Sequence, residues 1–256
     1  MTNHVSKPIQ IIPIDSIGPV ERGADVARLI TAAVDAQNDS FVDDDVLVVC
    51  SKIIAKAEDR VVRLAEVTPS ALATRFAQDS GKDPRLLEVV LRESKRIVRM
   101  NRGVLIVETH HGYVCANAGV DQSNVDGGDS VCMLPTDPDA SARHLRQAIE
   151  QFCSVQLAVL ISDSFGRPWR LGQLDVAIGI AGIEPVEDFG GRTDLKGFTL
   201  RDTQHATVDA ITAAAGLCFR KMSGIAACIV RGYSYVRAQA SHASGLIRDA
   251  ESDLFR

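Results

Sequence analysis

Apolar segments typical of β-strands alternate along this chain with amphipathic segments typical of α-helices, but the two kinds form no regular βαβ repeat. The strand candidates are residues 9–14, 46–49, 104–109, 112–117, 130–135, 157–163, 176–183 and 225–232. The helix candidates have apolar residues at helical spacing, and they are residues 23–36, 68–81, 84–99, 137–153 and 204–219. Such irregular interleaving favours a mixed α+β architecture over a doubly wound sheet.

Local signals predict where some of these segments begin and end. We expect Thr68 to cap the second helix candidate and Gly81 to end it. Asp137 or Asp139 is expected to cap the helix that leads to residue 153. The buried strand candidate before Cys50 is expected to run into a polar turn at Ser51.

The composition is that of an ordinary globular protein. With 256 residues, of which 46% are hydrophobic, the chain can bury a substantial core, and we treat residues 1–256 as one domain. The formal net charge of −5, with scattered basic residues, gives no electrostatic footprint for nucleic acid or an anionic membrane. The N-terminal stretch has no export-signal pattern, and no run approaches the ~18 apolar residues that span a bilayer. We therefore expect a soluble, cytoplasmic protein.

Cysteine and histidine patterns exclude several classes of site. The six cysteines lie singly in mostly apolar segments, without a CxxC pair, and are expected to be small buried residues. The six histidines form no HExxH motif, and no GxSxG elbow occurs, so zinc-protease and serine-hydrolase chemistry have no support. The single tryptophan, Trp169, can either line a pocket or pack as an ordinary aromatic.

The most unusual segment is the polar loop 116–129, ANAGVDQSNVDGGD, which lies between two strand candidates. Its Asp, Asn and Gly residues can serve only as turn formers and caps, which is their commonest use. Alternatively, Asp121 and Asn124 form part of a binding site at the ends of the strands.

A second polar group follows the strand candidate 157–163. Asp163 and Ser164 stand at its end, and Arg167 and Arg170 follow in the sequence DSFGRPWR. Two aspartates on separate strand ends can share one or two hard cations, and Mg²⁺ held in this way usually also contacts phosphate oxygens. We therefore predict that Asp121 and Asp163 lie within reach of one shared cation.

Two further segments can contact a nucleotide. Lys52 and Lys56, one helical turn apart after Ser51, can direct two ammonium groups toward a polyphosphate, although solvated lysines on a helix face are the simpler interpretation. The loop 16–23, SIGPVERG, can offer backbone amides. Neither GxxxxGK[ST] nor GxGxxG occurs in the chain, so no P-loop or Rossmann fingerprint is present.

Five motifs, in order and at compatible spacing, resemble the coenzyme F420-0:L-glutamate ligase family, the gamma-glutamyl ligases of F420 biosynthesis. They are SKIIAKAEDR (51–60), HGYVCANAGVDQSNV (111–125), LPTDPDASARHLR (134–146), SDSFGRPWRLGQLDVAIGIAGIEPVEDFGGRTDLKG (162–197) and GLIRDAESDLFR (245–256). The resemblance extends from residue 16 to the last residue. It implies a mixed-sheet α+β fold of two lobes, assembled as an intertwined homodimer. It also implies GTP-dependent addition of L-glutamate to F420-0, with further glutamates added by gamma linkage.

The resemblance also implies roles for individual residues. Asp121 and Asp163 correspond to ligands of one divalent cation, Mg²⁺ or Mn²⁺, and Ser164 stands where a Thr binds a second one. A monovalent cation such as K⁺ is a further candidate. Asp121 and Asp163, with Arg167 and Arg170, are the catalytic candidates. The residues that correspond to nucleotide contacts are Ser16, Ile17, Gly18, Pro19, Ser51, Lys52, Lys56, Asn124, Lys221, Met222, Ser223 and Gly224.

The chemistry of the implied reaction suits these residue types. Amide formation needs an activated acyl donor, and transfer of the γ-phosphoryl group to a carboxylate supplies an acyl phosphate. Because two anions must approach each other, cations beside Asp121 and Asp163 would stabilise the charge on the transferring phosphoryl group. Water must be excluded until the glutamate amine attacks.

Two departures from the family pattern leave alternatives open. Lys221, in RKMSG, replaces a Gln that resembles a second-metal ligand, so we predict one tightly bound divalent ion rather than two. Residues 208–210 read VDA where the family tends to read ADE. Ligase chemistry on another carboxylate-bearing acceptor, and a catalytically idle relative that binds a nucleotide or cofactor, are the alternative hypotheses.

Overall fold

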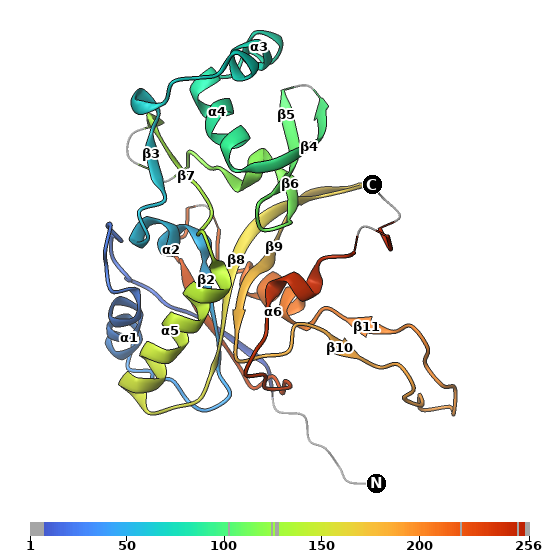
Figure 1. Ribbon diagram of the computed structural model, residues 1–256. Coiled ribbons are helices and arrows are strands. Elements are labelled where there is room, and N and C mark those ends of the chain that lie inside the picture. Colours follow the sequence, from blue (N-terminus) through green and yellow to red (C-terminus); the bar gives the residue numbers. More distant parts are fainter. Residues whose placement is uncertain are drawn as a thin grey trace.

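A five-stranded mixed sheet forms the centre of the protein (Figure 1). The computed structural model describes residues 8–101, 103–123, 125, 128–220, 222–249 and 251–253. The strand order is β1-β12-β2-β8-β9, and only β2 and β8 pair in parallel within this sheet. The strands are β1 (Gln10–Pro13), β12 (Ala227–Arg231), β2 (Val46–Cys50), β8 (Ala158–Arg167) and β9 (Arg170–Ala181). The mixed sheet confirms the α+β prediction.

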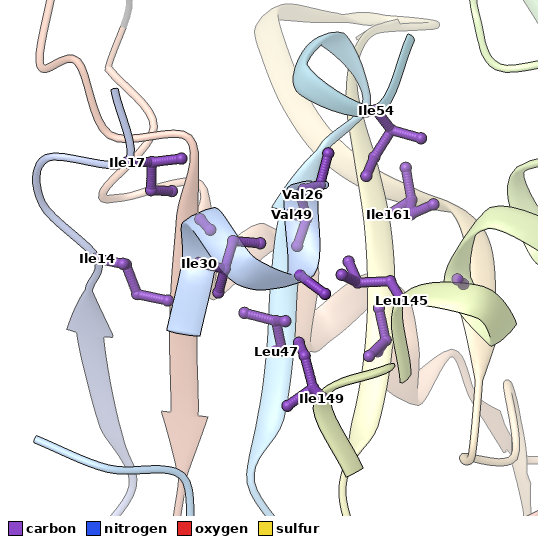
Figure 2. Packing of buried hydrophobic residues seen from close by; sticks show 14 of the residues in the cluster. Ile14, Ile17, Val26, Ile30, Leu47, Val49, Ile54, Leu145, Ile149 and Ile161 are labelled. Atoms are coloured by element: carbon purple, nitrogen blue, oxygen red, sulfur yellow. The ribbon is translucent and has the colours of Figure 1, made fainter. Parts of the chain in front are cut away.

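Helices cover both faces of this sheet, which explains why β2 is apolar along its whole length. Leu47 and Val49 pack with α1 (Val26–Ala36) and α5 (Pro138–Cys153) on one face. Figure 2 shows side chains from these three elements directed toward one another. On the other face, Val46 and Val48 pack with α6 (Thr207–Ala215). The short helix α2 (Ser51–Ala57) follows β2 directly.

Residues 61–132 form an insertion between α2 and α5, and the insertion has hydrophobic clusters of its own. Figure 1 shows it above the central sheet. It contains the strand pair β3 (Val61–Arg63) and β7 (Ser130–Cys132), the helices α3 (Ala71–Ser80) and α4 (Pro84–Arg92), the sheet β4 (Ser94–Asn101), β5 (Val104–Thr109) and β6 (Val114–Ala116), and the 3₁₀ turns η1 (Leu64–Glu66) and η2 (Asn117–Gly119).

The helix caps agree with the sequence signals in two of three cases. Asp137 caps α5, because its carboxylate accepts a hydrogen bond of 2.8 Å from the Ala140 amide. Gly81 ends α3 in the left-handed conformation. The prediction for the start of α3 was wrong: Ser70 rather than Thr68 is the N-cap, since the Ser70 hydroxyl accepts from the Ala73 amide.

Three boundaries also differ from the predictions. The helix predicted over residues 84–99 ends at Arg92, because residues 94–101 pair with β5 as a strand. Ser51 begins α2 instead of a turn. Strand β8 continues past Asp163 to Arg167, since its last residues pair with the start of β9.

Residues 187–205 form an arm that projects from the central sheet (Figure 1). At its base, β10 (Glu187–Asp188) pairs with β11 (Gln204–His205), which the sequence had assigned to a helix. Leu195 and Phe198 near the end of the arm are exposed.

Two features concern the chain as a whole. The six cysteines are free, and Cys115, Cys132 and Cys228 are buried as expected while the other three are half-buried. In the described part of the chain, no helix combines the length and the apolar character needed to cross a membrane.

Candidate active site

Three chain segments meet at one edge of the central sheet, where β1 and β2 end and β12 begins. The Ile14 amide donates to the Ala227 carbonyl at 3.0 Å, and the Cys50 amide donates to the Ala226 carbonyl at 2.8 Å. These two bonds place the loop after β1 and the start of α2 on either side of the segment that enters β12. The segments predicted to bind a nucleotide are therefore neighbours in space.

Asp121 and Asp163 converge on the first turn of α2. The Ser51 hydroxyl donates to Asp163 Oδ1 at 2.7 Å, and the Lys52 ammonium donates to Asp121 Oδ2 at 2.6 Å. Since Ser51 and Lys52 are consecutive residues, the two carboxylates lie in one site although they belong to distant segments. A cation shared between them remains a prediction.

Asp121 is held in an extensively hydrogen-bonded turn. Its backbone exchanges two hydrogen bonds, of 3.0 and 2.8 Å, with Cys132 of β7. Its side chain accepts from the Ser123 amide and hydroxyl. Burial alone would raise the pKa of Asp121, but the hydrogen bonds from Lys52 and Ser123 outweigh it and lower the pKa to about 2. The loop residues thus do form turns, and the same turns present an ionised carboxylate.

Asp163 has the opposite electrostatic environment. Burial is the main cause that raises its pKa, to about 7, and the nearby charges of Asp121 and Asp175 add to the effect. The hydrogen bond from Ser51 and the charge of Lys52 only partly compensate. A carboxylate in this environment gains free energy from a nearby cation.

This environment predicts a pH dependence of stability for the protein without metal. The pKa of Asp163 is higher in the folded state than in the unfolded state, so between about pH 4 and pH 7 the folded state holds a proton on Asp163 that the unfolded state has lost. The stability that this proton contributes is lost as pH rises from about 4 to about 7. Urea unfolding in EDTA at pH 5 and pH 7.5 should show a steeper loss of stability for wild type than for Asp163→Asn. Equal losses in the two proteins would contradict the assignment.

Ser164 and the two arginines occupy the hairpin formed by β8 and β9. The Ser164 hydroxyl donates to Asp175 Oδ1 at 2.5 Å across the strand pair. Arg167 lies opposite Arg170 in the register and donates to the Leu171 carbonyl at 2.7 Å. Trp169, in the turn between them, is 80% exposed, so it is not a buried core aromatic.

The predicted phosphate-binding lysines share a side of α2. Burial raises the pKa of the Cys132 thiol to about 11, against the lowering effect of both Lys52 and Lys56, so both ammonium groups lie near β7. Lys56 is half-buried and has no ion-pair partner among the residues that the structure describes. Such a cation is available to an anionic ligand.

The remaining nucleotide candidates differ in accessibility. Ser16, Gly18 and Pro19 are exposed, whereas the Ile17 side chain packs in the core and anchors the loop. Met222 is 98% exposed, and Ser223 donates to the Arg220 carbonyl at 2.8 Å next to the exposed Gly224. Asn124 and Lys221 lie outside the described residues.

The donors that converge here suit a hard divalent cation. They are carboxylate and hydroxyl oxygens, which Mg²⁺ and Mn²⁺ prefer, and Asp163 is a half-buried carboxylate that lacks an ion-pair partner among the described residues. Lys52 already neutralises part of the charge of Asp121. Within the described ranges, no three His, Cys, Asp or Glu residues form a complete metal-binding group. Any divalent ion here would therefore depend on Ser164, water or phosphate for its remaining ligands.

The chain is similar to known proteins along most of its length. The chain matches the model of the F420-0:Gamma-glutamyl ligase family over residues 16–232. It is 39% identical to the coenzyme F420:L-glutamate ligase of Methanothermobacter thermautotrophicus over 250 residues, which cover 97% of this chain and 99% of that protein. It is 38% identical to the coenzyme F420:L-glutamate ligase of Methanopyrus kandleri, with 97% and 98% of the two chains covered. The protein of the same name from Archaeoglobus fulgidus is 37% identical, with 97% and 96% covered.

The class of protein follows from these matches together with the fold: the chain is an enzyme, an amide-bond-forming ligase. It belongs to the F420-0:Gamma-glutamyl ligase family.

Proposed function

We propose that this protein is a GTP- and divalent-metal-dependent ligase that adds L-glutamate to F420-0, and that it can add further glutamates by gamma linkage. The observation that carries the proposal is the convergence of Asp121 and Asp163 on the Ser51–Lys52 step of α2. This arrangement joins the predicted metal ligands to the predicted phosphate-binding lysines in a chain of the F420-0:Gamma-glutamyl ligase family.

In the proposed reaction, the γ-phosphoryl group of GTP moves to the acceptor carboxylate, and the glutamate amine then displaces phosphate to form the amide. Lys52 and Lys56 hold the phosphates, because they lie one helical turn apart on α2 and Lys56 lacks a partner in the described part of the chain. Asp121, Asp163 and Ser164 would hold Mg²⁺ or Mn²⁺, which when bound supplies charge neutralisation at the transferring phosphoryl group. The exposed residues Ser16, Gly18 and Pro19 offer backbone groups to the nucleotide.

Lys52 has to change partners in this scheme. Its ammonium contacts the Asp121 carboxylate at 2.6 Å, at a position where a bound cation would also neutralise that carboxylate. A divalent ion and an ammonium group repel each other at close range. We infer that Lys52 turns from Asp121 toward the nucleotide phosphates when GTP and metal bind.

A product assay tests the proposal directly. The purified protein is incubated with GTP, L-glutamate, F420-0 and either Mg²⁺ or Mn²⁺, with and without K⁺, and the products are separated by mass. We expect F420-0 to gain the mass of one or more glutamyl residues, and we expect EDTA or omission of GTP to abolish the gain. Formation of product in EDTA would refute metal dependence. If GTP and glutamate released phosphate only when another carboxylate-bearing cofactor replaced F420-0, that cofactor would be the acceptor.

We also propose that the chain is one family domain of two lobes, with residues 61–132 as the second lobe, and that it forms a homodimer. The arm 187–205 supports the dimer, because it projects from the body and exposes Leu195 and Phe198. Exposed apolar side chains on a projecting element are typical of protein interfaces. The charged residues around them are compatible with a soluble free arm.

Light scattering tests the arm as the dimer contact. We expect the double substitution Leu195→Asp/Phe198→Asp to convert a dimer into a monomer, because the two carboxylates would be buried without partners at the interface. Leu72→Asp is the matched control, since Leu72 is also exposed but lies on α3. A wild-type protein with the mass of a single chain would refute the dimer, and a double variant that remains dimeric would place the interface elsewhere.

A further inference from the structure

Asp175 is a carboxylate of the site that the sequence patterns did not single out. It lies opposite Ser164 in the β8–β9 register, and its Oδ1 accepts the Ser164 hydroxyl hydrogen at 2.5 Å. Ser164 follows Asp163 directly in β8. Asp175 therefore lies across the hairpin from the predicted cation ligands.

The fold makes room for this carboxylate at one particular residue. An ideal Cβ atom added to Gly216, at the end of α6, would lie 2.1 Å from Asp175 Oδ2. Gly216 has an ordinary helical φ of −56°, so its backbone does not require glycine. The main constraint is instead the carboxylate, because a side chain at residue 216 would displace Asp175 Oδ2.

The placement is costly without a cation. Asp175 is half-buried and forms no ion pair with any residue that the structure describes. It also lies beside the C-terminal end of α6, where the helix dipole carries partial negative charge. Burial, an absent counter-charge and the helix end all disfavour an ionised carboxylate here, so the arrangement favours a cation nearby.

The hydrogen bond has a direct consequence for Ser164. A hydroxyl group has one hydrogen and two lone pairs, and Asp175 takes the hydrogen. The lone pairs of Ser164 Oγ are then free to face a cation as a neutral oxygen ligand. A carboxylate that accepts a hydrogen bond from a metal ligand both orients it and increases its basicity.

We propose that Asp175 is a positioning residue that orients the Ser164 hydroxyl as a ligand for the divalent cation, and that Gly216 is required because it leaves space for Asp175. This inference rests on the metal dependence put forward under the proposed function. Asp175 itself acts through Ser164.

Mn²⁺ binding tests the inference without catalysis. The free-ion electron paramagnetic resonance signal of Mn²⁺ is titrated with protein in the presence of a nonhydrolysable GTP analogue. Asp175→Asn, Ser164→Ala and Gly216→Ala should each weaken binding by roughly 10- to 100-fold. Ser164→Thr, which keeps the hydroxyl group, should bind nearly as tightly as wild type. Asp209→Asn is the matched control, since Asp209 is also half-buried beside β9 but accepts from the Ala177 amide instead of Ser164.

The double variant Asp175→Asn/Ser164→Ala separates positioning from an independent effect. If Asp175 acts through Ser164, the double variant binds Mn²⁺ about as tightly as the single variant that has the lower Mn²⁺ affinity. The proposal would be overturned if the fold losses of Mn²⁺ affinity in the two single variants multiplied in the double variant. Wild-type Mn²⁺ affinity in Asp175→Asn would overturn it as well.

Thermal unfolding without Mn²⁺ identifies any variant that binds poorly because it is misfolded. If Asp175→Asn is misfolded, Gly216→Ala serves in its place. A wild-type protein that does not bind Mn²⁺ would refute the metal dependence itself, whereas binding that is insensitive to residues 175 and 216 would refute this inference alone.

Discussion

Asp163→Asn should slow glutamate ligation by roughly 10²–10³-fold while leaving the protein folded. The asparagine side chain has almost the same shape and can still accept the hydrogen bond that Ser51 donates to Asp163 at 2.7 Å. It lacks the negative charge that a cation at this site requires. The initial rate of mass-detected product formation at saturating GTP measures the effect.

The same substitution should not lower the stability of the protein without metal at pH 7.5. Burial raises the pKa of Asp163 to about 7, so the ionised carboxylate is a cost to folding that asparagine removes. A large loss of rate without loss of stability identifies a charge that is retained for function. Asp209→Asn is the control, because burial raises the pKa of Asp209 as well but its carboxylate accepts from the Ala177 amide instead of from Ser51. An equal loss of rate in both variants would show that the effect is not specific to the site.

Arg231→Met should reduce the free energy of unfolding by roughly 3–5 kcal/mol, because it leaves a buried carboxylate without its partner. Asp45 is 0% exposed, and Arg231 contacts its two oxygens at 2.8 and 2.9 Å. The hydrogen bonds to Asp45 are the main cause that raises the pKa of Arg231. This pair joins the start of β2 to the end of β12, at the edge of the sheet opposite the site.

Urea unfolding measures this effect, and Arg237→Met is its matched control. Arg237 pairs with Asp44, but both side chains are exposed, so the loss should be less than ~1 kcal/mol. The double variant Asp45→Asn/Arg231→Met should recover part of the stability, because the buried charge is then removed. Equal losses for Arg231→Met and Arg237→Met would contradict the role assigned to burial.

The sequence predicted those parts of the fold in which local pattern and tertiary environment agree. The apolar runs of β2 and β8 and the spacing in α1 and α5 are visible in the sequence because a packed face requires apolar residues at fixed intervals. A cap at Asp137 or Asp139 was predictable because capping depends on neighbouring residues, and the structure shows that Asp137 is the cap. Two of the errors fall where distant pairing overrides local preference. Residues 94–99 have helical spacing but belong to a strand that pairs with β5, and the strand after Asp163 is extended by its pairing with β9.

The candidate site shows the same division. The residue types at positions 51, 52, 121 and 163 were sufficient to predict oxygen ligands and phosphate-binding cations, because those chemistries require carboxylates and ammonium groups. Which of them meet depends on tertiary contacts between distant segments: Ser51 with Asp163, and Lys52 with Asp121. The opposite pKa shifts of the two aspartates could not be read from the sequence, since they result from burial and from neighbours that only the fold supplies.

By itself, the sequence determined the α+β class and the family, because apolar periodicity and ordered motifs are properties of the chain alone. Only the tertiary structure decided where Asp175 lies. Its contact with Ser164 depends on the register of the β8–β9 hairpin, and the space for its carboxylate depends on Gly216 at the end of a different element. Strand register and the packing of a helix against a sheet are set by the sum of many distant contacts, so no local pattern around residue 175 could reveal them.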